Sequence, residues 1–381
     1  MKAALGILQD EFELSGEFQV FRGWQEKLLT TSWQAQCFSP AGTRLRASSF
    51  ARSKRGEFVF RKILEQWTFI REARAISNQV DLFHLFVPTP SFLWIADRVR
   101  IATRKPVVVT CLAEKADYLL RGDLLRNPAS FLFHLMRYVA AKALPKGHSS
   151  CELYFAATMS VAAQLEASGY PREKIQVDVP LLPQESLPDE PSMALGRWLD
   201  KAPTVLYIGH FLPNKGVELL LDAFAKLHHS GVRLLLAWSG LGDLHGIQKQ
   251  AKLLGIKDRM MITDYPVHKS TVFTHASALA LPARASYGQT APPMIMLEAF
   301  RAGIPVVIPR LRSVSDVGQE DKTVVFMDRG DSSTLVCQLQ RILDQPEFAE
   351  RMRIAQREWF KEHQSLDPSK VYDAVMKRFH G

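Results

Sequence analysis

Cysteine is scarce and widely spaced in this sequence. The 381 residues include four cysteines, which lie far apart and form no C-x-x-C pair. Zinc sites and disulfide frameworks both need closely or regularly spaced cysteines, so the sequence predicts neither of them. A reducing cytoplasm is the simplest expected setting.

Long hydrophobic runs are also missing. No apolar stretch approaches the roughly 18 to 20 residues that a membrane-spanning helix needs. The opening residues 1–8 are apolar apart from Lys2, but the apolar run stops at Gln9 and Asp10, before any small-residue cleavage site. We therefore expect residues 1–8 to supply a first buried strand, and the protein to be soluble or peripheral.

Acidic residues are the minority among the charges. The 48 Lys and Arg against 39 Asp and Glu leave a net charge of +9. This excess favours an anionic partner such as nucleotide phosphates, anionic lipid or nucleic acid. Because the sequence contains no zinc-finger, RNP or basic-zipper pattern, we expect no nucleic-acid partner.

Short apolar runs alternate with helix-length amphipathic stretches in the second half of the chain. The apolar residues of segment 217–227, for example, follow the i, i+3, i+4, i+7 spacing of a helix that buries one face. Continuous apolar strands point to a parallel sheet that is covered on both sides. We predict strands at residues 204–208, 232–237, 260–262, 279–281, 305–308 and 324–326.

The first half is less regular, but it also fits an α/β sheet. Three prolines between residues 183 and 191 oppose both a helix and a central strand, so they indicate a linker between two domains. We predict strands in the first half at residues 3–8, 81–86, 107–110 and 175–179.

A lysine follows the strand at residues 204–208. The strand runs into Gly209 and His210, and Lys215 and Gly216 then lead into the amphipathic helix. A glycine at a strand end lets a ligand approach the backbone, and a lysine adds a full charge to the positive end of the helix dipole. The pattern favours a phosphate cradle, with a solvated lysine beside a turn glycine as the alternative.

Two further elements lie on the same half. The strand at 232–237 ends in the glycine-rich turn from Gly240 to Gly242, a weak signal by itself. Pro293 is expected to start a helix that carries Glu298 among apolar residues. A carboxylate there needs hydrogen bonds, which the two hydroxyls of a ribose could supply; the alternative is a surface glutamate.

Together these residues resemble the C-terminal domain of the retaining glycosyltransferases of family 4, the glycosyl transferases group 1. The stretch 209–216 is similar to the family's G-x-x-x-x-x-K-G pattern, and 297–307 is similar to its L-E-A-M-A-x-G-x-P-V-V. A weaker similarity extends into 157–165 and 169–175. The resemblance implies an α/β glycosyltransferase-B fold, in which two Rossmann-like domains face each other across an interdomain cleft.

The domains follow from the resemblance and the proline-rich boundary. We predict an N-terminal, acceptor-side domain at 1–185 and a linker at 186–200. A nucleotide-sugar-binding domain is expected at 201–360. Residues 361–381 are expected to form a C-terminal helix, which could cross back to the N-terminal domain.

The resemblance also implies roles for individual residues. Lys215 would hold the donor diphosphate and Glu298 the ribose hydroxyls, so these two are the predicted catalytic residues. No metal and no cofactor would be needed, because protein cations and backbone amides would stabilise the departing diphosphate. The remaining predicted contacts are Gly16, Gly209, His210 and Arg312 for the phosphates, Tyr287, Gly288, Gln289 and Thr290 for the sugar, and Gly240, Asp264, Tyr265 and Pro266 for the base.

The sequence departs from the family pattern in three places. His210 stands where the family has an arginine, and a neutral imidazole offers fewer donors; Arg312 is a candidate to compensate, or else an exposed loop arginine. The first of the family's two glutamates is replaced, by Thr290 or by Ala285 depending on the alignment. The family's histidine after the strand at 107–110 is absent, and His84, which falls in the predicted strand at 81–86, is more typical of a structural histidine.

We therefore assign no general base. A retaining reaction in which the leaving phosphate accepts the acceptor's proton needs none. The predicted function is transfer of a sugar from a nucleotide-diphosphate donor to a glycan or lipid-linked acceptor. The alternatives are a catalytically impaired nucleotide-sugar-binding protein and, less favoured, a nucleotide-sugar epimerase.

Segment 44–74 gathers basic and aromatic side chains. Such a stretch could lie on an anionic membrane surface, where lipid-linked acceptors are found. The alternative is a solvated pair of helices with an ordinary core stripe. We expect a cytoplasmic protein, with a peripheral place at the inner face of the membrane if the first interpretation holds.

Overall fold

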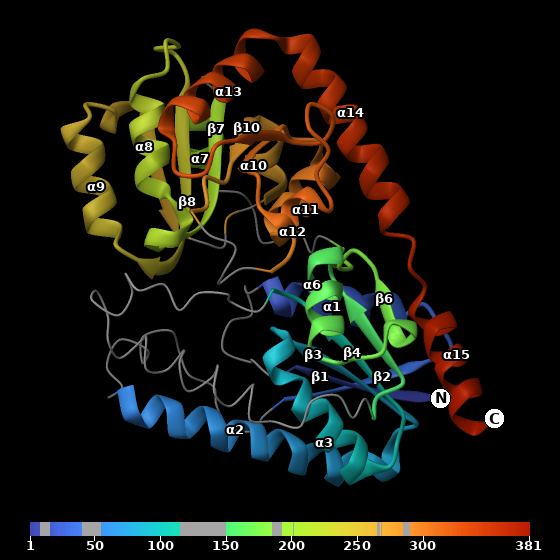
Figure 1. Cartoon of the computed structure of the whole chain (residues 1–381). Coiled ribbons are helices and arrows are strands. Elements are labelled where there is room, and N and C mark those ends of the chain that lie inside the picture. The colour runs from blue at the N-terminus through green and yellow to red at the C-terminus, as the bar shows by residue number, and fades with distance from the viewer. Residues whose placement is uncertain are drawn as a thin grey trace. The chain divides into compact units, whose positions relative to one another are not determined.

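A computed structural model describes residues 1–7, 16–39, 55–114, 150–184, 193–200, 202–264, 267, 269–284 and 290–381. The chain divides into two compact units. Unit 1 comprises residues 1–184, 287–291 and 366–381, and unit 2 comprises residues 185–286 and 292–365. Each unit is built on its own six-stranded sheet (Figure 1).

Unit 1 has a parallel sheet in the order β2-β1-β3-β4-β5-β6. Its strands are β1 (Lys2–Ile7), β2 (Gln34–Phe38), β3 (Leu82–Val87), β4 (Val107–Cys111), β5 (Leu153–Ala156) and β6 (Ile175–Val177). Its described helices are α1 (Gly16–Leu28), α2 (Arg55–Ile76), α3 (Leu93–Thr103), α6 (Met159–Ala167) and α15 (Pro368–His380), with short 3₁₀ turns η2 (Ser77–Gln79), η3 (Pro90–Phe92) and η4 (Arg172–Lys174).

Unit 2 has a second parallel sheet in the order β12-β11-β10-β7-β8-β9. Its strands are β7 (Thr204–Phe211), β8 (Arg233–Gly242), β9 (Met260–Asp264), β10 (Ala276–Ala280), β11 (Val306–Pro309) and β12 (Val325–Met327). Its described helices are α7 (Met193–Leu199), α8 (Val217–Ala225), α9 (Leu244–Leu253), α10 (Lys269–His275), α11 (Met294–Ala302), α12 (Arg312–Ser315), α13 (Ser332–Asp344) and α14 (Pro346–His363), with 3₁₀ turns η5 (Pro213–Lys215) and η6 (Lys257–Arg259).

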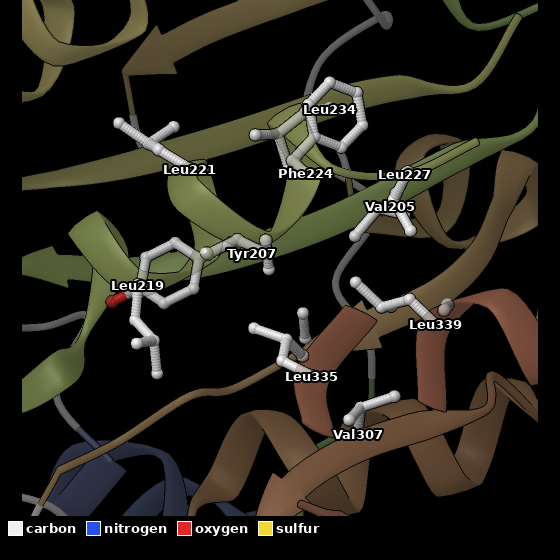
Figure 2. Close-up of a cluster of buried hydrophobic side chains, with 14 of the residues drawn as sticks. Val205, Tyr207, Leu219, Leu221, Phe224, Leu227, Leu234, Val307, Leu335 and Leu339 are labelled. Carbon is white, nitrogen blue, oxygen red and sulfur yellow. The ribbon is translucent and has the colours of Figure 1, made fainter. Parts of the chain in front are cut away.

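The core of unit 2 confirms the helix predicted at 217–227. Side chains of β7, α8 and α13 converge in one apolar cluster (Figure 2). Successive residues of a strand point to opposite faces, and in β7 both sets are buried, as a covered parallel sheet requires. The five apolar residues of the predicted helical face are all buried: Val217, Leu220, Leu221, Phe224 and Leu227.

All ten predicted strands are present, but β2 and β5 were not predicted. The edge strand β2 is half-exposed and has no continuous apolar run, so it lacks the signal of a buried strand. β5 is four residues long and buried throughout, and nothing in its sequence explains why it was missed when strands as short were predicted.

Residues 193–199 form a helix where the sequence placed part of the linker. Leu195 and Leu199 of α7 are buried, and α7 packs against α10 of unit 2. The apolar side chains of this segment therefore belong to the core of unit 2. Residues 185–192, which contain two of the three linker prolines, lie outside the described residues.

The C-terminal helix α15 packs within unit 1. Tyr372 is fully buried, and its hydroxyl lies 2.8 Å from Nδ1 of His84. The indole of Trp33 donates a hydrogen bond to Asp373 at 3.0 Å. Among the described residues, no helix is long and apolar enough to cross a membrane.

Candidate functional site

The strand order of unit 2 marks one place for a ligand. From β7 the chain steps outward to β8 and β9, and it then returns to β10 on the opposite side of β7. All six strands are parallel, so their carboxyl ends share one edge. In open sheets of this kind ligands bind at that edge, where the direction of the chain reverses. Here the reversal lies between β7 and β10.

Lys215 lies at this reversal point. It ends η5, directly after β7, and Gly216 then begins α8 in the left-handed conformation at φ 69°. A Cβ on Gly216 would come within 2.1 Å of the carbonyl oxygen of Pro282, so only glycine lets the two segments meet. The amide of Arg284 donates to the carbonyl of Asn214 at 2.8 Å and makes a second tie. The loop after β7 is therefore held against the segment after β10.

A bulge on β8 shapes the neighbouring strand end. Gly209 pairs with Trp238 and Phe211 pairs with Gly242, so one residue of β7 faces three residues of β8. Gly240 and Gly242 adopt φ values of 85° and 101°, which favour glycine. A Cβ at Gly240 would meet no atom of the described residues within 4 Å, so a ligand could approach this turn closely. Bulges of this kind are common beside functional sites.

His210 is the β7 residue that faces the bulge. Its Nδ1 forms a short hydrogen bond with the hydroxyl of Ser239 on β8. The buried hydroxyl of Tyr207 donates to the backbone carbonyl of His210 at 2.6 Å. Burial and the nearby positive charge of Lys215 lower the pKa of His210 to about 4, so the ring is neutral at pH 7. The structure therefore brings His210 and Lys215 together.

Glu298 lies in α11, on the other side of the reversal point. The residue is 4% exposed, which excludes the alternative of a surface glutamate. Nζ of Lys269, at the start of α10, lies 2.6 Å from its Oε1. Pro293 caps α11 and precedes its first residue, Met294, so the helix begins one residue later than expected. The ion pair explains how a carboxylate is tolerated among apolar neighbours.

Arg312 lies at the carboxyl end of β11 and begins α12. Its side chain is exposed, and it forms no ion pair with any residue that the structure describes. The nearby Arg310, by contrast, pairs with Glu320 at 2.6 Å and lies over the ring of Phe326 at 4.1 Å. Arg312 thus shares the edge that carries Lys215, but its contact with a phosphate stays a prediction.

The structure places the other predicted contacts only in part. Gly16 begins α1 in unit 1. Asp264 ends β9, the outermost strand on its side of the sheet, whereas Tyr265 and Pro266 lie outside the described residues.

The predicted sugar contacts are described at one position. Thr290 is 5% exposed and belongs to unit 1, where the next residue, Ala291, donates its amide to Leu112 at 2.8 Å. Tyr287, Gly288 and Gln289 lie outside the described residues. A role in sugar binding stays a prediction for all four.

Two residues at this edge were not predicted. Ser239 reaches His210 only because of the β8 bulge, and Lys269 reaches Glu298 from a helix that begins 29 residues earlier. The one available signal for Ser239 was its place directly before the glycine-rich turn. Nothing in the local sequence singled out Lys269.

The assembled edge is suited to binding an anion. It combines the Lys215 ammonium, the amino terminus of α8 and the exposed Arg312, with a neutral imidazole beside them. Among the described residues, no three acidic, cysteine or histidine side chains gather as a metal site would require.

Residues 193–359 match the family model of glycosyl transferases group 1. An alpha-D-kanosaminyltransferase from Streptomyces kanamyceticus is 27% identical over 157 residues, 40% of this chain and 40% of the relative. A GDP-mannose-dependent alpha-(1-6)-phosphatidylinositol monomannoside mannosyltransferase from Mycolicibacterium smegmatis is 26% identical over 171 residues, 42% of this chain and 44% of the relative. The matched stretches thus span less than half the length of these curated relatives.

Solved structures match the whole chain in fold. Sucrose-phosphate synthase from Thermosynechococcus elongatus gives a TM-score of 0.71 at 17% identity and covers 100% of this chain and 97% of that chain. HepE from Anabaena, in complex with UDP-glucose, gives a TM-score of 0.66 at 13% identity and covers 99% of both chains. The chain therefore has the glycosyltransferase-B fold, and its residues 193–359 match the model of the glycosyl transferases group 1 family.

Proposed function

We propose that the chain is a retaining glycosyltransferase of the family-4 type. It moves a sugar from a nucleotide-diphosphate donor to a glycan or lipid-linked acceptor, without a metal ion. The observation that carries the proposal is the placement of Lys215 and Glu298. They lie after the two strands, β7 and β10, between which the chain of unit 2 reverses.

Lys215 is the proposed partner of the diphosphate. In the reaction, the bond from the sugar's anomeric carbon to the donor phosphate breaks, and the acceptor hydroxyl oxygen bonds to the same carbon on the same face. The hydroxyl proton passes to the departing phosphate oxygen, so no protein base is required. The ammonium of Lys215 and the amides at the start of α8 stabilise the negative charge that grows on the leaving group.

Glu298 is the proposed partner of the ribose. A carboxylate has two oxygens that can accept about four hydrogen bonds. Lys269 contacts Oε1, so Oε2 remains an acceptor for a ribose hydroxyl. The ion pair also orients the side chain of Glu298 before the donor arrives, which reduces the ordering that binding requires.

The names of the related proteins support an activated-sugar donor. HepE has been solved with UDP-glucose, and the mycobacterial relative is named for its dependence on GDP-mannose. That relative is named for acting on a phosphatidylinositol mannoside, which supports a lipid-linked acceptor for this chain. On α2, Trp67 is 57% exposed and Arg71 is exposed beside it, as a peripheral membrane contact would require. Of the other basic residues of segment 44–74, those at positions 44–54 lie outside the described residues.

A catalytically impaired nucleotide-sugar-binding protein is the second candidate. It is favoured by one feature, the loss of the first family glutamate, which Thr290 or Ala285 replaces. Under this proposal the donor binds but its glycosidic phosphate bond stays intact. The third candidate, an epimerase, would need further carboxylates and histidines that the sequence does not offer at the predicted sites.

Incubating the purified chain with a panel of UDP-, GDP-, ADP- and dTDP-sugars separates these functions. We expect one donor class to raise the melting temperature and to be hydrolysed slowly, with and without EDTA. NMR of the released sugar would report retention of the anomeric configuration at the earliest times. Binding without hydrolysis would favour the impaired protein, and loss of hydrolysis in EDTA would contradict metal independence. If no donor binds, the proposal fails.

A further inference from the structure

His210 occupies the position where the family pattern has an arginine, so the chemistry of its ring decides what replaces the guanidinium. A guanidinium always carries charge and several donors. His210 is neutral at pH 7, because burial and the charge of Lys215 disfavour its protonation. A neutral imidazole has one N–H only, and it can donate to a ligand through one nitrogen only. The tautomer therefore decides whether His210 can bind a phosphate oxygen.

The two nitrogens of the His210 ring differ in their hydrogen bonds. Nδ1 is occupied by the hydroxyl of Ser239. No protein group among the described residues hydrogen-bonds to Nε2, although the ring is only half-buried. The nitrogen left for a ligand is therefore Nε2, on a residue at the ligand-binding edge of the sheet.

We propose that Ser239 is a positioning residue of the donor site. Its hydroxyl donates a hydrogen bond to Nδ1 and thereby holds His210 as the Nε2–H tautomer, so that Nε2 can donate to a phosphate oxygen of the nucleotide diphosphate. This inference rests on the proposed function, because it takes the anion to be the donor diphosphate. It adds to that function a role for Ser239 and the position of one proton on the ring of His210.

The backbone around His210 is built to hold this arrangement. Tyr207 donates its buried hydroxyl to the carbonyl of His210 and so fixes the peptide from which the ring projects. A Cβ at Gly209 would lie 3.0 Å from that hydroxyl, so a larger residue would crowd this bond. On β8, the indole of Trp238 donates to the carbonyl of Leu241 at 2.9 Å and braces the bulge that carries Ser239. The backbone on both sides of the Ser239–His210 hydrogen bond is therefore fixed by further hydrogen bonds.

The opposite tautomer is the competing arrangement. If Nδ1–H donated to Ser239, Nε2 would be a bare acceptor close to the positive charge of Lys215. Such a ring would repel a phosphate oxygen, and the site would lose a donor where the family pattern has an arginine. A serine hydroxyl can rotate to donate or accept, so the choice is open to direct measurement.

The first test needs no ligand. Long-range ¹H–¹⁵N spectra of the full-length chain report the tautomer of each histidine, and His210→Gln identifies the signals of His210. We expect the Nε2–H tautomer in the wild type, a mixture of tautomers in Ser239→Ala, and its restoration in Ser239→Thr. An Nδ1–H tautomer in the wild type, or no change in Ser239→Ala, would overturn the proposal.

The second test measures binding of UDP and GDP by calorimetry. We expect Ser239→Ala to weaken the nucleotide that binds by about fivefold, the effect of one neutral hydrogen bond, and Ser239→Thr to restore it. In a His210→Gln background, Ser239→Ala should have no further effect, because the amide nitrogen of glutamine takes the place of Nε2 and has no tautomer to fix. Ser333→Ala, on the exposed start of α13, is the matched control and should bind like the wild type.

The two tests distinguish a failure of the proposed function from a failure of the role of Ser239. If neither UDP nor GDP binds the wild type, the proposed function fails, while the spectra still decide whether Ser239 sets the tautomer. If the nucleotide binds and Ser239→Ala leaves its affinity unchanged, the donor site stands and Ser239 has no role in it.

Discussion

Two neutral histidines, one in each unit, show the difference between a polar group that holds the fold and one that is open to a ligand. His84 in unit 1 is fully buried, and both ring nitrogens bond within the protein, to Tyr372 at 2.8 Å and to Thr110 at 2.7 Å. His210 in unit 2 is half-buried and bonds through Nδ1 alone among the described residues. The hydrogen bonds of His84 form a closed network that joins β3, β4 and α15. His210, which keeps one ring nitrogen open to a ligand, lies at the edge where ligands bind in sheets of this kind.

The ion pair of Lys269 and Glu298 combines both properties. It is largely buried, as a structural pair is, yet it lies beside the reversal point of the sheet. The effect of mutating this pair on the free energy of unfolding therefore shows how much the edge of unit 2 contributes to stability.

Replacing Lys269 by methionine should have the largest effect on stability. The change leaves the carboxylate of Glu298 buried without its ammonium partner, so we expect a loss of about 3 kcal/mol in the free energy of unfolding. Urea titration would measure it. Lys269→Met with Glu298→Gln should recover much of the loss, because the uncompensated charge is gone. Equal stability of the single and double variants would show that the pair is not the cause.

Replacing Lys215 by alanine should have the opposite profile. The side chain is partly exposed, so the unfolding free energy should change little, while hydrolysis of the donor identified in the panel should fall by at least about 100-fold. Lys252→Ala, on the exposed face of α9, is the control for loss of a single positive charge. A Lys215→Ala variant that hydrolyses donor at the wild-type rate would remove the basis for placing the diphosphate there.

The elements that the sequence predicted correctly are those whose formation depends on residues close to one another in the chain. The central strands are continuous apolar runs because they are buried on both faces, so β7 and β8 could be located from their own residues. Lys215 could also be located from its own neighbours, because the adjacent Gly216 is the residue type that a left-handed turn before α8 favours.

The features that were missed depend on neighbours in space. β2 is half-exposed at the sheet edge, where no apolar run is needed. Ser239 meets His210 of β7 only through the bulge in its own strand, β8, and Lys269 meets Glu298 only because α10 and α11 pack together. Without the fold, none of these pairs can be recognised.

The closed network of His84 leads to a dependence of stability on pH, which is expected to be modest between pH 7 and 5. Burial lowers the pKa of His84 to about 3, whereas an unfolded histidine titrates near 6.5. Between these values the unfolded chain binds a proton that the folded chain does not. Stability is therefore complete above about pH 6.5 and falls as the pH falls toward 3, by up to about 1.4 kcal/mol per pH unit.

His84→Gln removes this titration and should flatten the pH dependence, although the variant is less stable at pH 7 because its buried hydrogen bonds are disturbed. Urea titrations at pH 5 and 7, followed by hydrogen exchange in the β3 and β4 peptides, would measure the difference. His210→Gln is the comparison from the other unit: the pKa of His210 is lowered only to about 4 and its half-exposed ring is screened by solvent, so its smaller effect should show most clearly below pH 5. If His84→Gln and the wild type lose stability in parallel between pH 7 and 5, another group sets the acid limit of unit 1. If His210→Gln flattens the curve more than His84→Gln does, the contrast between the closed and the open histidine is wrong.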